Sequence, residues 1–303
     1  MSFLIFCKSF RNDIFRAKRL IESILKYNSE HIPFYLSIPQ NDLGFFLKHI
    51  DFDCLNKKNS GKFHIIFDED VVKSNPTAQI KKYYELNGYI SQQVIKAEAW
   101  RYLECSNYLC IDSDCLFTKP FGLKNFIHQN GTPYTIMHDG QELLQQAEQA
   151  NQKYVKRSYL QDSSRLKNEF KRSGLDYDFG PSPLIWSAKV WEALEKHLFF
   201  QGETIWDAFS RQPLEIRWYG ETLLKYQPIS IYPIAPLFKC YHYEWQFLNQ
   251  ATQALSHDLH SQVSEKIGIV IQSSWDISLQ PSFARKSFPS RVWKKIKSFT
   301  KPQ

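Results

Sequence analysis

The 303-residue sequence lacks most of the features that would place it in a special class of protein. It has no apolar run near the roughly 20 residues needed to span a bilayer. The apolar run at its N-terminus is too short for a signal peptide, and no basic region precedes it. Eleven glycines and the absence of a low-complexity tract argue against a disordered chain or a repeat array. With 43% hydrophobic and 16% aromatic residues, we expect a globular protein with an ample core.

The six cysteines also lack any Cys-x-x-Cys spacing. Several of them stand in apolar segments with strand or helix character, where a thiol behaves as a small buried hydrophobe. We therefore expect reduced core thiols in a cytosolic protein. These are Cys7, Cys54, Cys105, Cys110, Cys115 and Cys240.

The positive charge of the sequence is concentrated at its C-terminal end. Residues 285–303 contain seven lysines and arginines and no acidic residue, and the other 31 basic residues balance 31 acidic ones. A nucleic-acid-binding body normally carries a basic face of its own. The composition therefore does not favour a nucleic-acid partner.

Short apolar runs that alternate with amphipathic segments predict the fold class. The first three expected strands cover residues 3–7, 33–38 and 62–67. Their alternation with helices indicates a parallel α/β sheet, whose ligands bind beyond the carboxyl ends of the strands. Residues 8–13, Asp68 and the turn at 112–114 should then lie along one rim.

The turn at 112–114 is the most informative stretch. Residues 108–111 form a short apolar run typical of a strand buried on both faces, and Asp112, Ser113 and Asp114 follow it directly. Two carboxylates at the end of a buried strand are costly to hold without a partner. A hard divalent cation such as Mg²⁺ or Mn²⁺ would supply one, although both aspartates could simply be turn residues.

A helix expected over residues 90–104 leads into this strand. Gln92 and Lys96 are four residues apart and share a face of that helix. Lys96 could contact a phosphate, or it could be a solvated lysine.

The chain after the turn begins with a long polar segment. Residues 141–173 carry seven basic and four acidic residues, and we expect them to be helical. Such an insertion can serve as a mobile lid or an acceptor-binding arm, or it can be a solvated helical hairpin.

The segment after this insertion contains two further carboxylates of interest. Asp178 stands just before an expected sharp bend at Gly180, ahead of a strand over 184–186. A second bend, at Gly220, would begin a helix with Glu221 in its first turn. A carboxylate at that place often only complements the helix dipole.

Two expectations concern the chain beyond this helix. Residues 229–233 form a further expected strand. His242 lies among aromatic residues, where a lone histidine is either a core residue or a ligand.

The helix, strand and Asp-Ser-Asp turn of residues 92–117 resemble the nucleotide-sugar-binding half of glycosyltransferases with the GT-A fold. Residues 180–187 and 218–221 look like the acceptor half of bacterial members that serve surface-polysaccharide synthesis. The resemblance covers most of residues 1–250 in the order of elements, and the Asp-x-Asp core is its sharpest part. It implies an α/β, Rossmann-like mixed sheet, mainly parallel, with helices on both faces of a single large domain.

The resemblance also implies a metal cofactor, Mn²⁺ or Mg²⁺, that bridges the diphosphate of the sugar donor. Asp112 would lie nearer the ribose, and Asp114 would be the firmer metal ligand. A downstream histidine commonly completes the site in related enzymes, and His242 is the best-placed candidate. The surroundings of His242 depart from the better-known histidine signature of the family.

The same resemblance places a set of residues around the nucleotide sugar. The exit of the first strand and Asp68 would border the base, and Lys96 would stabilise charge on the leaving diphosphate. The expected nucleotide-sugar-binding residues are Lys8, Ser9, Asp13, Asp68, Gln92, Lys96, Asp112 and Ser113.

Transfer with inversion requires a base within hydrogen-bond reach of the acceptor hydroxyl. Glu221 is the first candidate for this catalytic role, and Asp178 is the second. Transfer with retention would need no such base, and Glu221 would then only bind the acceptor. The donor base and sugar are not identified by any residue, and a UDP-sugar is expected from family frequency.

The resemblance divides the chain into functional parts. A GT-A-like domain would cover residues 1–280, with a nucleotide-sugar-binding half at 1–120, a lid or acceptor arm at 141–173 and an acceptor half at 174–250. Residues 281–303 would form a basic amphipathic tail that lies on an anionic membrane surface or is simply a disordered basic tail. The first of these would suit an enzyme in the cytoplasm, or at the inner face of the cytoplasmic membrane, that acts on a lipid-linked saccharide or other surface glycan.

Two other readings remain open. A phosphatase or phosphotransferase of the haloacid-dehalogenase type also carries Asp-x-Asp after a buried strand, but usually on the first strand of its core. A non-catalytic, membrane-docked binding module would use the tail as its functional part.

Overall fold

The computed structural model describes residues 3–58, 61–77, 80–253 and 265–273. The expected basic tail, residues 281–303, lies outside the described residues. The strands are β1 (Phe3–Lys8), β2 (Phe34–Ile38), β3 (Phe63–Phe67), β4 (Asn107–Asp112), β5 (Cys115–Phe117), β6 (Thr135–Ile136), β7 (Leu184–Ser187), β8 (Pro233–Ile234), β9 (Phe238–Tyr241) and β10 (Gly268–Ile271). The α-helices are α1 (Ile14–Tyr27), α2 (Leu43–His49), α3 (Phe52–Lys58), α4 (Asp68–Lys73), α5 (Ile80–Glu85), α6 (Gly88–Tyr102), α7 (Gln141–Gln149), α8 (Lys153–Glu169), α9 (Ala188–Phe199), α10 (Ile205–Arg211), α11 (Glu215–Tyr226) and α12 (Glu244–Gln253).

The main sheet has the strand order β3-β2-β1-β4-β7. The first four strands are parallel, and β7 runs antiparallel to β4 at the edge of the described sheet. The register of β1 against β4 places Lys8 opposite Asp112, so both strands end at the same edge. The predicted α/β class with a mixed, mainly parallel sheet is confirmed.

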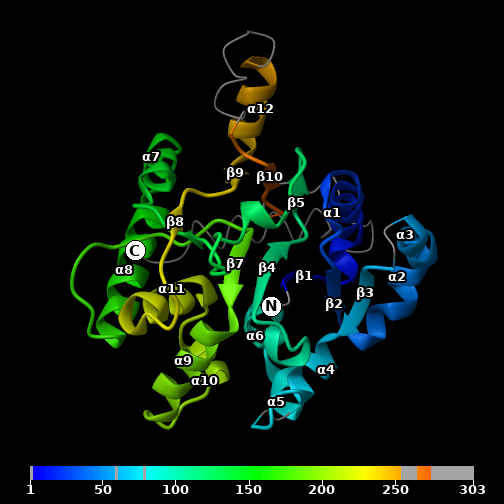
Figure 1. Ribbon diagram of the computed structural model, residues 1–303. Coiled ribbons are helices and arrows are strands. Elements are labelled where there is room, and N and C mark those ends of the chain that lie inside the picture. The colour runs from blue at the N-terminus through cyan, green and yellow to red at the C-terminus, as the bar shows by residue number, and fades with distance from the viewer. Residues whose placement is uncertain (1–2, 59–60, 78–79, 254–264, 274–303) are drawn as a thin grey trace, which may run out of the picture.

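Two cores form because successive side chains of a strand point to opposite faces. On β1, Leu4 and Phe6 pack with helices α4, α6, α9, α10 and α11, whereas Ile5 and Cys7 pack with α1 and α2. All six cysteines are free, and five of them are buried, as the sequence predicted for core thiols. Figure 1 shows the sheet between these helical layers, with α2 and α3 at one end and α7 and α8 at the other.

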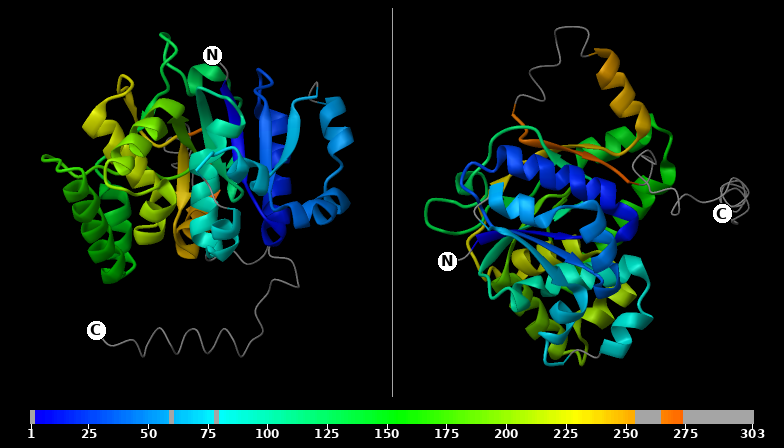
Figure 2. Two further views of the ribbon diagram at one scale, coloured as in Figure 1. Left: turned by 90° about the horizontal axis from the view of Figure 1, so that it is seen from below. Right: turned by 90° about the vertical axis from the view of Figure 1, so that its right-hand side faces the viewer.

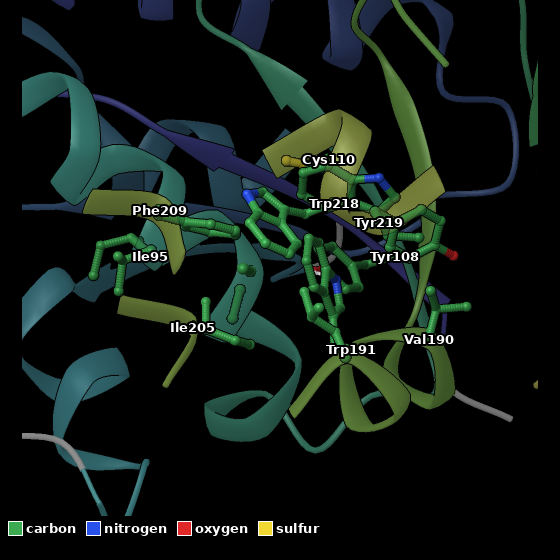
Figure 3. Packing of buried hydrophobic residues seen from close by; sticks show 14 of the residues in the cluster. Ile95, Tyr108, Cys110, Val190, Trp191, Ile205, Phe209, Trp218 and Tyr219 are labelled. Carbon is green, nitrogen blue, oxygen red and sulfur yellow. Dashed lines mark hydrogen bonds between the residues drawn. The ribbon is translucent and has the colours of Figure 1, made fainter. Parts of the chain in front are cut away.

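An aromatic cluster fixes α6 against β4 of the main sheet. Trp191 donates a hydrogen bond from Nε1 to the hydroxyl of Tyr108 at 2.8 Å, and Tyr108 donates to the carbonyl of Lys96, also at 2.8 Å. All three residues are buried. Figure 3 shows Trp191 and Tyr108 packed with Tyr219 and Trp218 in this core. The core therefore holds the backbone of Lys96 in place.

The last described strand returns to the turn after β4. β10 pairs antiparallel with β5 and parallel with β9, so it lies between strands that are far away in sequence. The amide of Ile271, at the end of β10, donates to the carbonyl of Asp114 at 3.1 Å. This small sheet brings Gln272 and Ser273 beside the Asp-Ser-Asp turn.

The predicted helical segment at 141–173 is confirmed as the two helices α7 and α8, which contact each other. They lie beyond α11 at one end of the molecule in Figure 1 and in the left view of Figure 2. Gly140 begins this pair with a φ of +69°, and a Cβ there would lie 2.2 Å from the hydroxyl of Tyr159. Glycine at this position allows α8 to pack closely against the start of α7.

Two local predictions are wrong. Gly220 does not bend the chain, because it lies inside α11, where a Cβ would be only 2.2 Å from the ring of Phe179. Its small size permits close packing, and Glu221 is consequently in the middle of the helix rather than in its first turn. The strand expected at 229–233 is displaced to Pro233–Ile234, and Ile229 and Ile231 pack against the core without strand pairing.

Among the described residues, no helix is long and apolar enough to cross a bilayer.

Candidate functional site

A cleft of about 840 Å³ opens at the carboxyl ends of β1 to β4. It is lined by Lys8, Asp13, Asp68 and the Asp112–Asp114 turn, so the predicted rim is present in the structure. Ser9, Gln92, Lys96 and Ser113 also line it, which brings together all eight residues expected to surround a nucleotide sugar. The register of the parallel strands explains this convergence.

The wall of the cleft on the β3 side is a closed hydrogen-bonded network. Asp68 is fully buried and accepts from Lys8 Nζ at 2.8 Å, from Ser37 Oγ at 2.6 Å and from the hydroxyl of Tyr83 at 3.1 Å. Burial, together with the nearby Asp68 carboxylate, raises the pKa of Tyr83 far above its usual value. Tyr83 therefore stays protonated and keeps donating to Asp68.

The exit loop of β1 contributes one paired and one unpaired group. Asp13 accepts from Arg16 at 2.8 Å, and burial raises the pKa of the Asp13 carboxyl although Arg16 opposes this. The hydroxyl of Ser9 is buried and makes no hydrogen bond within the described part of the chain. Because Ser9 lines the cleft, its hydroxyl is available to a ligand there.

Lys96 links the centre of the cleft to its α11 side. Its Nζ lies 2.6 Å from Asp112 Oδ1 and 3.4 Å from Glu215 Oε1. Burial lowers the pKa of Lys96, but Asp112 and Glu215 more than offset this, and the net pKa is well above its usual value. Burial also raises the pKa of Glu215, with Asp112 adding to the effect and Lys96 opposing it. Lys96 is thus a charged lysine in the site, not a solvated one.

Asp114 is the least stabilised carboxylate of the site. Burial, reinforced by the neighbouring Asp112, raises the pKa of Asp114 to about 7, although the amide of Ser273 donates to Asp114 Oδ2 at 3.0 Å. A carboxylate with such a pKa binds a proton readily and would gain more from a cation. Within the turn, Asp112 is therefore paired with Lys96, and Asp114 is the carboxylate that a cation or a proton would stabilise most.

The side chains that line the cleft also carry more negative than positive groups. The lining contains six carboxylates and only three basic side chains, and the latter are Lys8, Lys96 and Arg217. Within the described residues, no three His, Cys, Asp or Glu side chains cluster closely enough to hold a metal by themselves. Asp112 and Asp114 fit an ion such as Mg²⁺, which keeps several waters and takes one or two carboxylates together with phosphate oxygens.

His242 is not brought into a metal-sized cluster with the two aspartates. Its Nδ1 lies 3.2 Å from Gln272 Nε2 and 3.6 Å from Cys240 Sγ. Burial lowers the pKa of His242. His242 is not part of the lining of the cleft, whereas its neighbour Gln272 is.

The two catalytic candidates are in very different places. Asp178 lines the cleft, and its Oδ1 accepts from the amide of Gly180 at 2.9 Å. Glu221 is buried, is not part of the lining, and forms a two-pronged ion pair with Arg172 at 2.5 and 2.9 Å. Of the two candidates, only Asp178 faces the cleft, whereas Glu221 is held inside the fold by Arg172.

The chain matches DUF6492, a family of unknown function, over residues 4–300. It belongs to this family. No curated protein matches the chain. The family match includes every element that lines the cleft, from β1 to β10, so the two halves of the site belong to one family unit. Since the description of DUF6492 names no activity, its function has to be argued from the chemistry of the cleft.

Sequence reasoning missed several lining residues of this DUF6492 member. Glu215 and Arg217 come from the start of α11, Tyr159 from α8, and Gln272 and Ser273 from the end of β10. Starting the predicted helix at residue 215 rather than at Gly220 would have put Glu215 and Arg217 in its first turn. Gln272 and Ser273 carry no local signal, since only the pairing of β10 with β5 brings them to Asp114.

Proposed function

We propose that this protein is a metal-dependent glycosyltransferase of the GT-A type. It would transfer a sugar from a nucleoside-diphosphate sugar to a hydroxyl of a saccharide acceptor. The observation that carries the proposal is the Asp112-Ser-Asp114 turn at the carboxyl end of β4, facing a cleft with six carboxylates and three basic groups. Mg²⁺ or Mn²⁺ would offset part of this negative charge and would let a donor diphosphate bind beside the carboxylates, because the cation takes ligands from both.

The residues of the chain would divide the work as follows. Asp112 and Asp114 would hold the metal, which supplies charge stabilisation for the leaving diphosphate when bound. Lys96, kept protonated by its two carboxylate neighbours, would add a second positive charge near the leaving group. The free hydroxyl of Ser9 and the Lys8–Asp68 pair would border the nucleoside.

Asp178 takes over as the proposed base for an inverting transfer. It lines the cleft and comes from the β7 side, whereas the nucleoside would occupy the β1–β3 side. A base positioned there would face the acceptor hydroxyl across the sugar. A lipid-linked saccharide or surface glycan, reached from the cytoplasmic side of the membrane, remains the proposed acceptor class.

The test is metal-dependent nucleotide binding. UDP, GDP, CMP and dTDP are titrated calorimetrically into the protein with Mn²⁺ or Mg²⁺, and again with a chelator. We expect one of them to bind only when metal is present, and the matching nucleotide sugar to be slowly hydrolysed. Equal binding in chelator would overturn the proposal. Hydrolysis of p-nitrophenyl phosphate that is lost in Asp112→Asn would instead indicate a phosphatase of the haloacid-dehalogenase type.

A further inference from the structure

Arg217 is a buried arginine on the cleft wall that the proposed chemistry has not used. It lies near the start of α11, is 8% exposed and lines the cleft. One guanidinium nitrogen donates to the carbonyl of Tyr177 at 3.3 Å, and the guanidinium carbon lies 4.4 Å from the ring centre of Tyr159. Its planar group is therefore held by the Tyr177 carbonyl and by the side chain of Tyr159.

Arg217 differs from the other shielded arginines in having no carboxylate partner. Arg16 pairs with Asp13, Arg101 with Glu98 and Glu195, and Arg172 with Glu221. Across residues 3–58, 61–77, 80–253 and 265–273, no ion pair involves Arg217. A buried charge without a counterion is costly unless a ligand supplies one.

The position of Arg217 within the cleft indicates which ligand this is. The sheet order puts β3 and its closed Asp68 network on one side of the Asp-Ser-Asp turn, and β7 on the other. Arg217 belongs to the β7 side, because it contacts Tyr159 of the α7–α8 pair and Tyr177 of the chain that leads to β7. A nucleoside on the β1–β3 side would leave the Arg217 side to the acceptor.

We infer that Arg217 binds an anionic group of the acceptor, so that the acceptor is an acidic or phosphorylated saccharide. This inference rests on the proposed glycosyl transfer. A guanidinium presents a rigid fork of N–H groups that matches a carboxylate or a phosphate with two parallel hydrogen bonds. Asp178, which lines the same cleft, would face the hydroxyl of the saccharide whose acid group Arg217 holds.

The first experiment compares two sugars that differ only in charge. Methyl glucuronide carries a carboxylate where methyl glucoside carries a hydroxymethyl group, and glucose 6-phosphate tests the phosphate alternative. Binding of each is measured by saturation-transfer NMR, without nucleotide or metal. We expect the wild-type protein to prefer an acidic sugar over its neutral counterpart by at least about tenfold, as for a charge-assisted hydrogen bond. No preference in the wild type would overturn the inference.

The second experiment assigns the preference to the side chain. Arg217→Gln should abolish the preference, and Arg217→Lys should keep part of it, since lysine retains the charge but not the fork. Arg211→Gln is the matched control, because Arg211 also lies over an aromatic ring, at 5.4 Å from Trp218, but pairs with carboxylates outside the cleft. A preference that survives in Arg217→Gln contradicts the inference. If this variant does not fold, Arg217→Lys and the wild-type comparison decide.

A third measurement separates the acceptor from the donor. UDP binding with Mn²⁺ is measured for the wild type and for Arg217→Gln. Unchanged UDP binding together with a lost acid preference supports the acceptor role. Weaker UDP binding together with an unchanged preference for the acidic sugar would assign Arg217 to the donor diphosphate and would overturn the inference. Metal-independent UDP binding by the wild type would refute the proposed function instead, whatever the result with the sugars.

Discussion

Asp68 and Asp114 both follow parallel strands of the main sheet, and both line the cleft, yet their surroundings are opposite. Asp68 accepts from a lysine, a serine and a tyrosine, and no part of it is exposed. Asp114 accepts one backbone hydrogen bond, and burial beside Asp112 raises its pKa to about 7. The first carboxylate has three donors inside the fold, whereas the second has one backbone donor and a neighbouring carboxylate that raises its pKa.

The surroundings of the two carboxylates distinguish a residue that supports the fold from one that could bind a ligand. The residue types alone do not make this distinction. Both residues are aspartates near strand ends, and the sequence predicted Asp68 as a nucleotide-sugar contact and Asp114 as a metal ligand. A carboxylate whose charge is met by buried donors holds the wall in shape. A carboxylate crowded by another one and weakly compensated is prepared for a cation or a proton. Removing each in turn should therefore produce opposite effects on stability and binding.

The largest expected effect is on stability, from Asp68→Ala. The substitution leaves the Lys8 ammonium buried without its partner, and breaking a buried pair in this way costs about 3–5 kcal/mol. Urea unfolding followed by circular dichroism measures the loss. A loss below about 1 kcal/mol would mean that the Lys8–Asp68 network is not structural.

The next effect is on binding, from Asp114→Ala. Metal-dependent nucleotide binding should weaken by at least about 10–100-fold, the usual cost of losing a group that only supports a metal ligand, because the site loses one of its two proposed ligands. Stability should change little, since only the bond to the Ser273 amide is lost. Isothermal calorimetry and urea unfolding are run on the same samples. If Asp114→Ala unfolds more easily but binds nucleotide normally, Asp114 supports the fold and does not take part in binding.

A third effect is the pH dependence of metal binding. The pKa of Asp114 is about 7 in the metal-free protein, so lowering the pH below this value loads the carboxylate with a proton that the metal must displace. Affinity for Mn²⁺ should fall by up to about tenfold for each pH unit below 7 and level off above it. Calorimetric titrations across this range give the slope. A flat profile, or one shared by Asp114→Asn, would show that Asp114 does not titrate with binding.

The smallest effect is expected from Asp70→Ala, which is the control for the substitutions at Asp68 and Asp114. Asp70 lies two residues after Asp68 on α4, is partly exposed, and pairs with the exposed Lys73 at 3.3 Å. An exposed pair of this kind contributes about 0.2–1 kcal/mol, and nucleotide binding should be unchanged. A large effect here, in either assay, would indicate that α4 as a whole is sensitive and would weaken the conclusion drawn from Asp68→Ala.

The sequence predicted the sheet well because its signals are local. Apolar runs and the polar turns after them mark β1 to β4, and parallel strands necessarily bring their carboxyl ends to one edge. That is why Lys8, Asp68 and Asp112 were expected along one rim and were found there.

Predictions failed where a residue type has more than one use. Glycine at position 220 was interpreted as a bend but serves the close approach of Phe179, and this error moved the expected helix start and with it the role of Glu221. The partnership of Glu221 with Arg172 spans 49 residues and has no local signature. Arg217 was overlooked for the same reason, since its lack of a carboxylate partner is visible only in the folded chain.

The position of β10 beside the Asp-Ser-Asp turn also determines when the cleft can form during synthesis of the protein. Ser273 follows Asp114 by 159 residues, so at synthesis rates of about 5–20 residues per second the ribosome needs roughly 8–30 s to supply it. During that interval β5 has no β10 beside it, and Asp114 lacks the amide that faces it in the finished fold. The nascent chain therefore completes its cleft only after β10 and Ser273 have been made. A chaperone that shields the edge of β5 in the meantime would protect the strand that follows the Asp-Ser-Asp turn.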